Sequence, residues 1–161
     1  MTLFELIPTP DTAPELSAAM AEYAGRRLGK GVIVCNDTPL FVANRVGLLA
    51  RMCTIWGMIE EGLSIEQVDA VASQPMGRPK TGVFRLGDLI GLDTTANVAR
   101  YLYSVAVEDE RREMFRMPPF IEKLLADGAL GNKSGRGYYQ KVGSEIRVLD
   151  WKSGNIVPLS P

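Results

Sequence analysis

The stretch that most constrains this chain runs from Phe41 to Ile59, because apolar side chains occur there on two faces of a helix. A helix that is apolar on most sides is buried on most sides, so other helices have to surround it. Thr38 and Pro39 offer an N-cap and a first-turn proline, and Gly62 offers an end, which together predict a long helix over residues 38–62. The first face consists of Val42, Val46, Leu49, Cys53 and Trp56, and the second of Phe41, Leu48, Met52, Ile55 and Ile59.

Before this helix the sequence alternates between strand, helix and strand. Residues 3–7 and 32–35 are short apolar runs typical of strands, and a capping box at Thr12–Glu15 predicts that a helix begins between them. This pattern is one βαβ unit, and two strands do not form a stable sheet by themselves. We therefore expect residues 1–37 to be the end of an α/β domain whose other strands lie upstream. The helix should direct four side chains toward a core: Leu16, Met20, Tyr23 and Leu28.

The remainder of the chain has mainly helical signals. A second capping box, Ser64–Gln67, predicts a short helix, and further helices are expected at 83–90, 94–107 and 119–127. Short strands at 138–141, 145–149 and 155–157 predict a β-hairpin or meander. The predicted fold is mainly α. Its parts are a βαβ segment at 1–37, an all-helical domain at 38–141 and a β tail at 142–161.

Composition excludes several classes of function. The chain of 161 residues has no histidine, so it supplies no histidine base and no histidine metal ligand, and we predict no metal site. With 18 basic and 19 acidic residues its net charge is −1, which argues against a nucleic-acid partner. No targeting segment or run of about 18 apolar residues is visible, so we expect no membrane partner and a cytoplasmic location. Two cysteines inside apolar runs also favour a reducing compartment.

Two residues are candidates for a functional site. Asn44 lies within the first turns of the apolar helix, where a carboxamide can fix a substrate oxygen, although a bond to the backbone or to a neighbouring domain is the alternative. Lys133 lies in a glycine-rich loop that can approach an anionic cofactor closely, and a solvated turn is the alternative. Three basic residues in or just after the loop of residues 74–82 could meet phosphates or face solvent: Arg78, Lys80 and Arg85.

Neither nucleotide-binding glycine motif is present. Gly131-Asn132-Lys133-Ser134 has an asparagine where a phosphate-binding P-loop needs glycine before the lysine. No GxGxxG sequence occurs in the chain, so these residues cannot hold a dinucleotide by that motif.

Four stretches, in the order in which they occur, resemble the C-terminal part of the 3-hydroxyacyl-CoA dehydrogenases. They are residues 5–12 (ELIPTPDT), 34–45 (VCNDTPLFVANR), 77–86 (GRPKTGVFRL) with Asp88 and 91–93 (GLD), and 130–139 (LGNKSGRGYY). The GRPK loop and the tail after residue 145 are similar to the fused enzymes that join this dehydrogenase to an enoyl-CoA hydratase. The resemblance therefore implies an internal fragment of such an enzyme.

The resemblance implies the oxidation of an L-3-hydroxyacyl-CoA to the 3-oxoacyl-CoA, with hydride transfer to NAD. It assigns Asn44 to the catalytic site, where it positions the reacting oxygen of the substrate, and Lys133 to a contact with NAD. It makes residues 1–37 the end of an NAD-binding Rossmann domain and residues 38–141 the helical substrate-binding and dimerisation domain. It places the base, a His–Glu pair, and most of the NAD site upstream of this chain. The implied partners are the acyl-CoA substrate and a second copy, bound through the helical domain. The isolated chain is expected to be inactive.

Two other functions remain as alternatives. Dehydrogenases of small 3-hydroxy acids use a lysine base four residues after the asparagine, a place that Leu48 occupies here. The chain could also be a non-catalytic helical dimerisation module. An intact glycine-rich turn and a His–Glu pair upstream would distinguish the dehydrogenase from that module.

Overall fold

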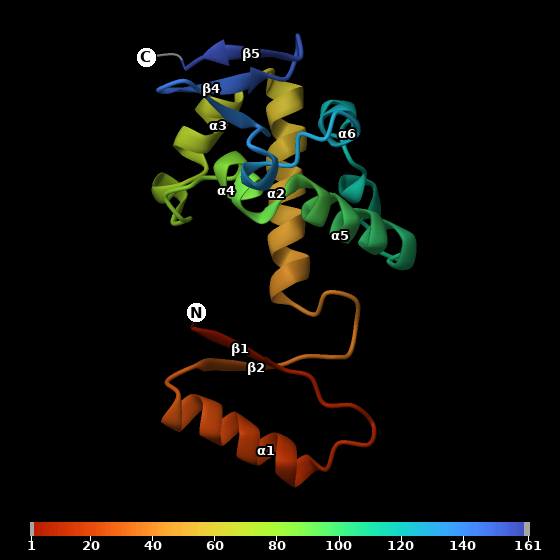
Figure 1. Ribbon diagram of the computed structural model, residues 1–161. Helices are drawn as coiled ribbons and strands as arrows, with labels where there is room; N and C mark the ends of the chain where they lie inside the picture. Colours follow the sequence, from red (N-terminus) through yellow and green to blue (C-terminus); the bar gives the residue numbers. More distant parts are fainter. Residues whose placement is uncertain (1, 160–161) are drawn as a thin grey trace. The chain divides into compact units, whose positions relative to one another are not determined.

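The computed structural model describes residues 2–159 (Figure 1). It divides the chain into two compact units, Met1–Gly47 and Leu48–Pro161, each of which is described by itself below. The boundary between these units falls inside the long helix, whereas the sequence pattern placed the first boundary after residue 37. The roles assigned to residues 1–37, 38–141 and 142–161 stay a prediction.

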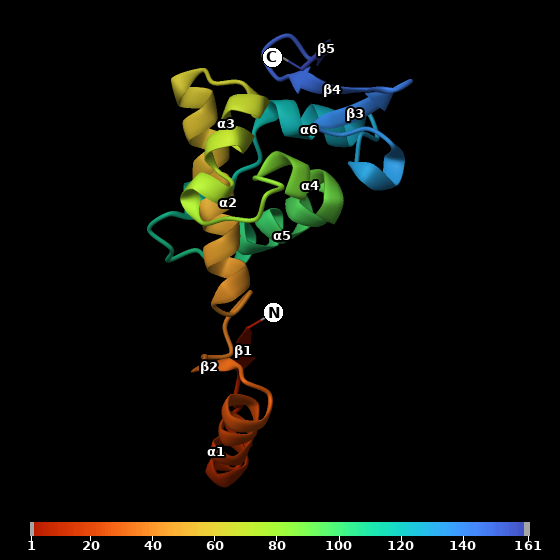
Figure 2. The same cartoon turned by 90° about the vertical axis from the view of Figure 1, so that its left-hand side faces the viewer.

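The first unit is a βαβ unit, as predicted. Strand β1 (Leu3–Leu6) pairs in parallel with β2 (Gly31–Val34), in a register that aligns Leu3 with Gly31. Helix α1 (Pro14–Glu22) and a π-helical turn, η1 (Tyr23–Arg27), connect the two strands (Figures 1 and 2).

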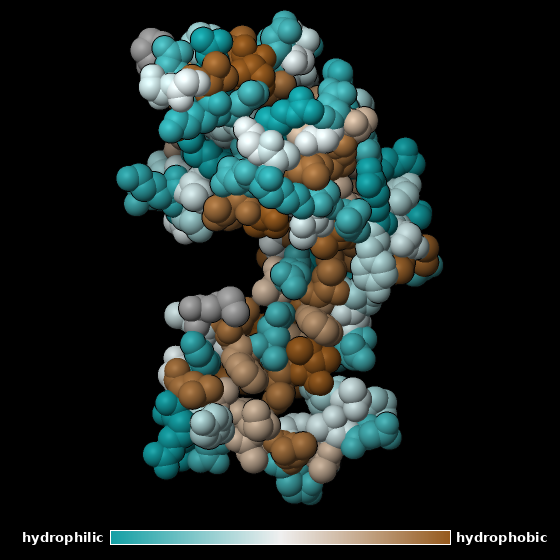
Figure 3. Space-filling model, in the orientation of Figure 1, coloured by the Kyte–Doolittle hydropathy of each residue, from teal (hydrophilic) through white to brown (hydrophobic). Residues whose placement is uncertain are grey.

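Two expectations for α1 were wrong. Thr12 does not cap the helix, because its hydroxyl accepts the N–H of Thr9 at 2.9 Å within the preceding turn, and Ala13 is the N-cap instead. The side chains expected to face a core are exposed, since the two strands offer little surface to cover them. Hydrophobic atoms accordingly appear on the surface of this unit in Figure 3. The exposed residues are Leu16, Met20, Tyr23 and Leu28.

The long helix α2 (Ala43–Glu61) begins five residues later than the sequence predicts. Leu40 and Phe41 adopt left-handed backbone angles, with φ of 66° and 52°, so the chain cannot continue as a right-handed helix from Thr38. Most of the second predicted face is buried, including Leu48, Met52 and Ile55, as expected. The first face is not, since Val42, Val46 and Cys53 are exposed.

The second unit packs short helices around the later turns of α2. They are α3 (Ile65–Val71), α4 (Phe84–Ile90), α5 (Leu92–Val105) and α6 (Pro119–Ala126), close to the predicted ranges. The predicted Ser64–Gln67 capping box is confirmed by both of its hydrogen bonds, at 2.8 and 3.2 Å. Loops contain 3₁₀ turns at Gln74–Met76, Arg112–Phe115 and Asn132–Ser134. The largest fully buried side chains include Phe84, Phe115, Met52, Ile55, Met58 and Leu102.

An antiparallel meander completes the second unit. Its strands are β3 (Tyr139–Val142), β4 (Glu145–Asp150) and β5 (Asn155–Pro158), in the order β3-β4-β5. Trp151 Nε1 donates to the carbonyl of Leu63 at 2.8 Å, and Lys152 Nζ donates to that of Gly62 at 2.7 Å, so the meander is bonded to the turn after α2.

The predicted fold class is therefore confirmed: a mainly helical domain, preceded by a βαβ segment and followed by short antiparallel strands. Within residues 2–159, no helix combines the length and the apolar character needed to cross a membrane.

Candidate functional site

Asn44 lies in the first turn of α2 with its side chain exposed. The sequence left open a bond from this carboxamide to the backbone, but among residues 2–159 its side chain has no hydrogen-bond partner. Its donor and acceptor atoms are therefore free to bind a ligand. Four residues later, Leu48 is a buried apolar side chain, which cannot act as the base of the alternative class of dehydrogenase.

The carboxylate of Glu5 fixes the start of the helix that presents Asn44. Glu5 Oε1 accepts the N–H groups of Val42 and Ala43 at 2.9 and 2.8 Å. These are among the N–H groups that a helix start leaves unpaired, and a negative charge there is favourable. Glu5 thus connects β1 to the first turn of α2 and stabilises the left-handed turn at Leu40 and Phe41 that precedes it.

Lys133 lies in the 3₁₀ turn of the glycine-rich loop, and 48% of its side-chain surface is exposed. Its ammonium pairs with the carboxylate of Asp93 in the first turn of α5, at 2.6 Å. The hydrogen bond from Lys133 holds the pKa of Asp93 below its usual range. Lys133 is therefore accessible to an anionic ligand, which would share the ammonium with Asp93.

A buried carboxylate, Asp88, fixes the loop that carries Lys133. The side chain of Asp88 accepts the N–H groups of Tyr138 and Tyr139 at 2.9 and 2.8 Å, at the point where the loop enters β3. A Cβ at Gly137 would lie 2.0 Å from Asp88 Oδ1, so only glycine fits this approach. Burial raises the pKa of Asp88 to about 6, although the two N–H groups act in the opposite direction.

A second buried carboxylate, Asp69, fixes the start of α4. It accepts the N–H groups of Val83 and Phe84, both at 2.7 Å, and that of Arg85 at 3.0 Å. The hydroxyl of Tyr139 donates to the same carboxylate at 3.0 Å, and the Arg85 guanidinium lies 4.0 Å from the centre of the Tyr139 ring. Burial raises the pKa of Tyr139, so this phenol stays a neutral donor.

Asp69 and Asp88 are structural residues that the sequence analysis did not single out as a site. Together they bring the stretches 77–93 and 130–139 side by side in the second unit. The signal available in the sequence was an aspartate inside each of two apolar helical segments, since such a carboxylate needs hydrogen-bond partners when it is buried.

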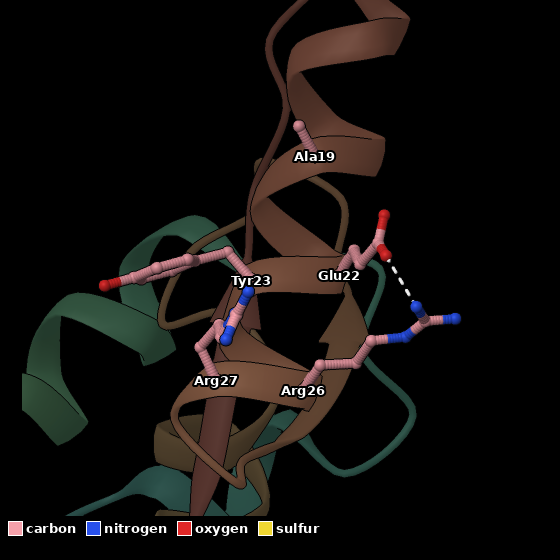
Figure 4. Close-up of a pocket in the computed structure, with 5 residues that line it drawn as sticks. All are labelled: Ala19, Glu22, Tyr23, Arg26 and Arg27. Carbon is pink, nitrogen blue, oxygen red and sulfur yellow. Dashed lines mark ion pairs between the residues drawn. The ribbon is translucent and has the colours of Figure 1, made fainter.

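A cavity of about 490 Å³ lies on the first unit along α1 and η1 (Figure 4). It is lined by Ala19, Glu22, Tyr23, Arg26 and Arg27, and Glu22 pairs with Arg26 at 2.9 Å. None of the predicted site residues lines it. Residues 2–159 contain no cluster of three or more carboxylate or cysteine side chains that could hold a metal ion.

Comparisons with known proteins point to one family. Residues 41–141 match the family model of the 3-hydroxyacyl-CoA dehydrogenase C-terminal domain. The chain is 41% identical over 150 residues to a protein of Bacillus subtilis named "probable 3-hydroxyacyl-CoA dehydrogenase", covering 93% of this chain and 19% of that protein. A Deinococcus radiodurans protein of the same name is 38% identical, with 89% of this chain and 40% of that protein covered.

Solved structures give the same result. The chain superimposes with a TM-score of 0.71 on the (S)-3-hydroxybutyryl-CoA dehydrogenase of Ralstonia eutropha, at 31% identity, covering 85% of this chain and 46% of that one. The 3-hydroxybutyryl-CoA dehydrogenase of Escherichia coli gives a TM-score of 0.70 at 30% identity, covering 87% and 29%. The chain thus spans less than half the length of each of these relatives.

Proposed function

Because this chain belongs to the 3-hydroxyacyl-CoA dehydrogenase family, we propose that it forms the helical part of an enzyme that oxidises L-3-hydroxyacyl-CoA to 3-oxoacyl-CoA in fatty-acid β-oxidation. The observation that carries the proposal is the family match over residues 41–141, which contains both candidate site residues. In this proposal the chain supplies one wall of the acyl-CoA cleft and a homodimer interface. The exposed first face of α2 supports the interface, through Val46 and Cys53.

Asn44 is proposed to orient the reacting oxygen of the substrate. Its carboxamide is exposed, has no partner among residues 2–159, and stands on a helix turn that Glu5 fixes. The charge on this oxygen changes during hydride transfer. A donor that is already held in place can bind the oxygen throughout this change without having to reorganise. Leu48 offers no competing base.

NAD is the proposed cofactor, and it would accept the hydride. The residues of this chain fit a contact at one edge of NAD, because the Lys133 ammonium is exposed beside a loop of small residues. They do not fit a complete dinucleotide site, because no GxGxxG motif is present. Lys133 would bind an anionic part of NAD. We propose that residues 1–161 alone show no turnover.

The test is NADH oxidation with acetoacetyl-CoA, for the product of the longest reading frame that contains this sequence. We expect Asn44→Ala to lower kcat/KM at least ten-fold, about 1.4 kcal/mol of transition-state binding. Asn97→Ala, which removes an exposed carboxamide from α5, is the matched control and should leave the rate unchanged. Wild-type protein without turnover would favour the non-catalytic helical module. An Asn44→Ala variant as active as the wild type would show that Asn44 does not act in the catalytic site.

The contact between Lys133 and NAD predicts a separate kinetic effect. We expect Lys133→Gln to raise the KM for NADH about five-fold, equivalent to about 1 kcal/mol, with a smaller change in kcat. Lys141→Gln removes an exposed charge from β3 and should leave both constants unchanged. An unchanged KM in the Lys133→Gln variant would mean that Lys133 lies in a solvated turn and makes no contact with NAD.

A further inference from the structure

The guanidinium of Arg51 lies within the second unit without a carboxylate partner. Its Nη1 donates to the hydroxyl of Thr95 at 3.2 Å, and that hydroxyl donates to the carbonyl of Gly91. A Cβ at Gly87 would lie 3.7 Å from the same Nη1 and 2.9 Å from the Tyr138 ring, so the guanidinium and this ring both pack against α4 at Gly87. Among residues 2–159, Arg51 forms no ion pair.

A second guanidinium without a carboxylate partner lies close by. Arg78 Nη1 is 3.5 Å from the hydroxyl of Thr54, which stands one turn after Arg51 on α2. The backbone of Arg78 is fixed, because its N–H donates to the carbonyl of Ser73 at 2.9 Å. Arg78 also forms no ion pair within the described part of the chain. Burial lowers the pKa of Arg51, and the charge of Arg78 lowers it further.

The two buried carboxylates of the second unit, Asp69 and Asp88, have other partners. Asp69 attracts Arg51 at longer range, but its oxygens accept three backbone N–H groups and the Tyr139 hydroxyl. Asp88 accepts two backbone N–H groups. Charges removed from water are normally paired, and these two half-buried guanidiniums repel each other instead.

We propose that Arg51 and Arg78 together bind a phosphate group. Two unpaired positive charges match a phosphate monoester, which carries about −1.5 to −2 charges at neutral pH, better than they match a single carboxylate. The planar fork of each guanidinium fits two phosphate oxygens, and each keeps N–H donors that the threonines do not use. The site includes neither Asn44 nor Lys133, so its phosphate affinity can be tested independently of turnover, and only its assignment to coenzyme A rests on the proposed function.

Phosphate binding can be measured on the 161-residue chain without any turnover. We would titrate millimolar inorganic phosphate at constant ionic strength and follow the arginine side-chain Nε–H signals by NMR, together with the thermal midpoint. We expect the Arg51 and Arg78 signals to shift and the midpoint to rise. Arg78→Gln should weaken binding at least ten-fold. Arg51→Lys, which keeps the charge but loses the fork, should weaken it less.

Arg100→Gln is the matched control, because Arg100 is exposed and already paired with Glu122. It should bind phosphate as the wild type does. Equal stabilisation of the wild type and the Arg78→Gln variant would overturn the proposal, since it would reflect a general salt effect. Coenzyme A and 3′-dephospho-coenzyme A then identify the source. Tighter binding of coenzyme A assigns the site to its 3′-phosphate. Equal binding of both compounds, tighter than that of inorganic phosphate, assigns it to the diphosphate that they share, and binding no tighter than that of inorganic phosphate assigns it to free phosphate.

Discussion

At the scale of single residues, the buried carboxylate of Asp88 determines the path of the chain into β3. Asp88 is 3% exposed, and its two oxygens accept the N–H groups of Tyr138 and Tyr139, fifty and fifty-one residues later in the chain. The loop that carries Lys133 ends at this contact. The position of a candidate cofactor contact therefore depends on a residue that touches no ligand itself.

The raised pKa of Asp88 makes its contribution to stability depend on pH. Its folded value of about 6 lies above the ordinary value of 3.8, so the folded protein binds the proton more tightly than the unfolded chain does. The contribution is therefore fully present below about pH 4 and is lost as the pH rises through about 6. Its size is at most about 3 kcal/mol, from 1.36 kcal/mol per pKa unit.

We expect the Asp88→Asn variant not to show the loss of stability that this carboxyl group causes as the pH rises through about 6. The difference in the free energy of unfolding between wild type and variant, measured in urea at pH 4 and at pH 7, should be larger at pH 4. Glu122→Gln, at an exposed position on α6, should not produce the same pH-dependent difference. A difference for Asp88→Asn that is independent of pH would mean that this carboxyl group titrates normally.

The residue types of the candidate site could be predicted, but their surroundings could not. Asn44 and Lys133 were found because an amide in an apolar helix and a lysine among glycines are unusual locally. Asp88 and Asp69 act through backbone groups that are distant in the sequence, and no local pattern shows such partners. The exposure of Asn44 also depends on packing that the helical period does not specify.

At the scale of elements, the start of α2 shows how tertiary contacts change a local signal. Thr38 and Pro39 favour a helix from that point, yet Leu40 and Phe41 are left-handed, and Glu5 from β1 accepts the N–H groups at the actual start. The other helices were predicted within a few residues. Three of them begin at a local signal: α3 at the Ser64 cap, α5 after Gly91 and α6 at Pro119. Helix α4 has no side-chain cap of its own, and Asp69 accepts the N–H groups at its start.

The left-handed angle at Leu40 predicts an unusual order of stability. Glycine adopts this angle freely, whereas a β-branched residue there is strongly disfavoured. We expect Leu40→Gly to be more stable than Leu40→Val by about 1–2 kcal/mol, although valine retains more apolar surface. Urea unfolding of the two variants measures this difference. A more stable valine variant would show that the turn relaxes to a right-handed conformation.

At the scale of the whole molecule, apolar side chains remain on the surface of the first unit (Figure 3). Leu16 and Tyr23 are each more than half exposed, and Met20 lies on the same helix. The pair β1–β2 also leaves strand edges without partners among the described residues. The sequence predicted an amphipathic helix here but not what covers its apolar face.

This surface predicts self-association of the 161-residue chain. We expect sedimentation velocity to detect species larger than a dimer that increase with concentration, and to detect fewer of them in the Leu16→Gln/Met20→Gln double variant. Both positions are exposed, so the free energy of unfolding should change by less than about 0.5 kcal/mol each. Met76→Gln, at an exposed position of the second unit, should associate as the wild type does. Identical behaviour of all three proteins would exclude α1 as the associating surface.

The hydrogen bond from Trp151 to Leu63 has a consequence for synthesis on the ribosome. Donor and acceptor are 88 residues apart, so the carbonyl of Leu63 emerges long before the indole that binds it. At about 5–20 residues per second, the interval is roughly 4 to 18 s. During that time water must solvate the carbonyls of both Gly62 and Leu63, because Lys152 follows Trp151 directly. The turn after α2 therefore acquires these two bonds only after Trp151 and Lys152 have been translated.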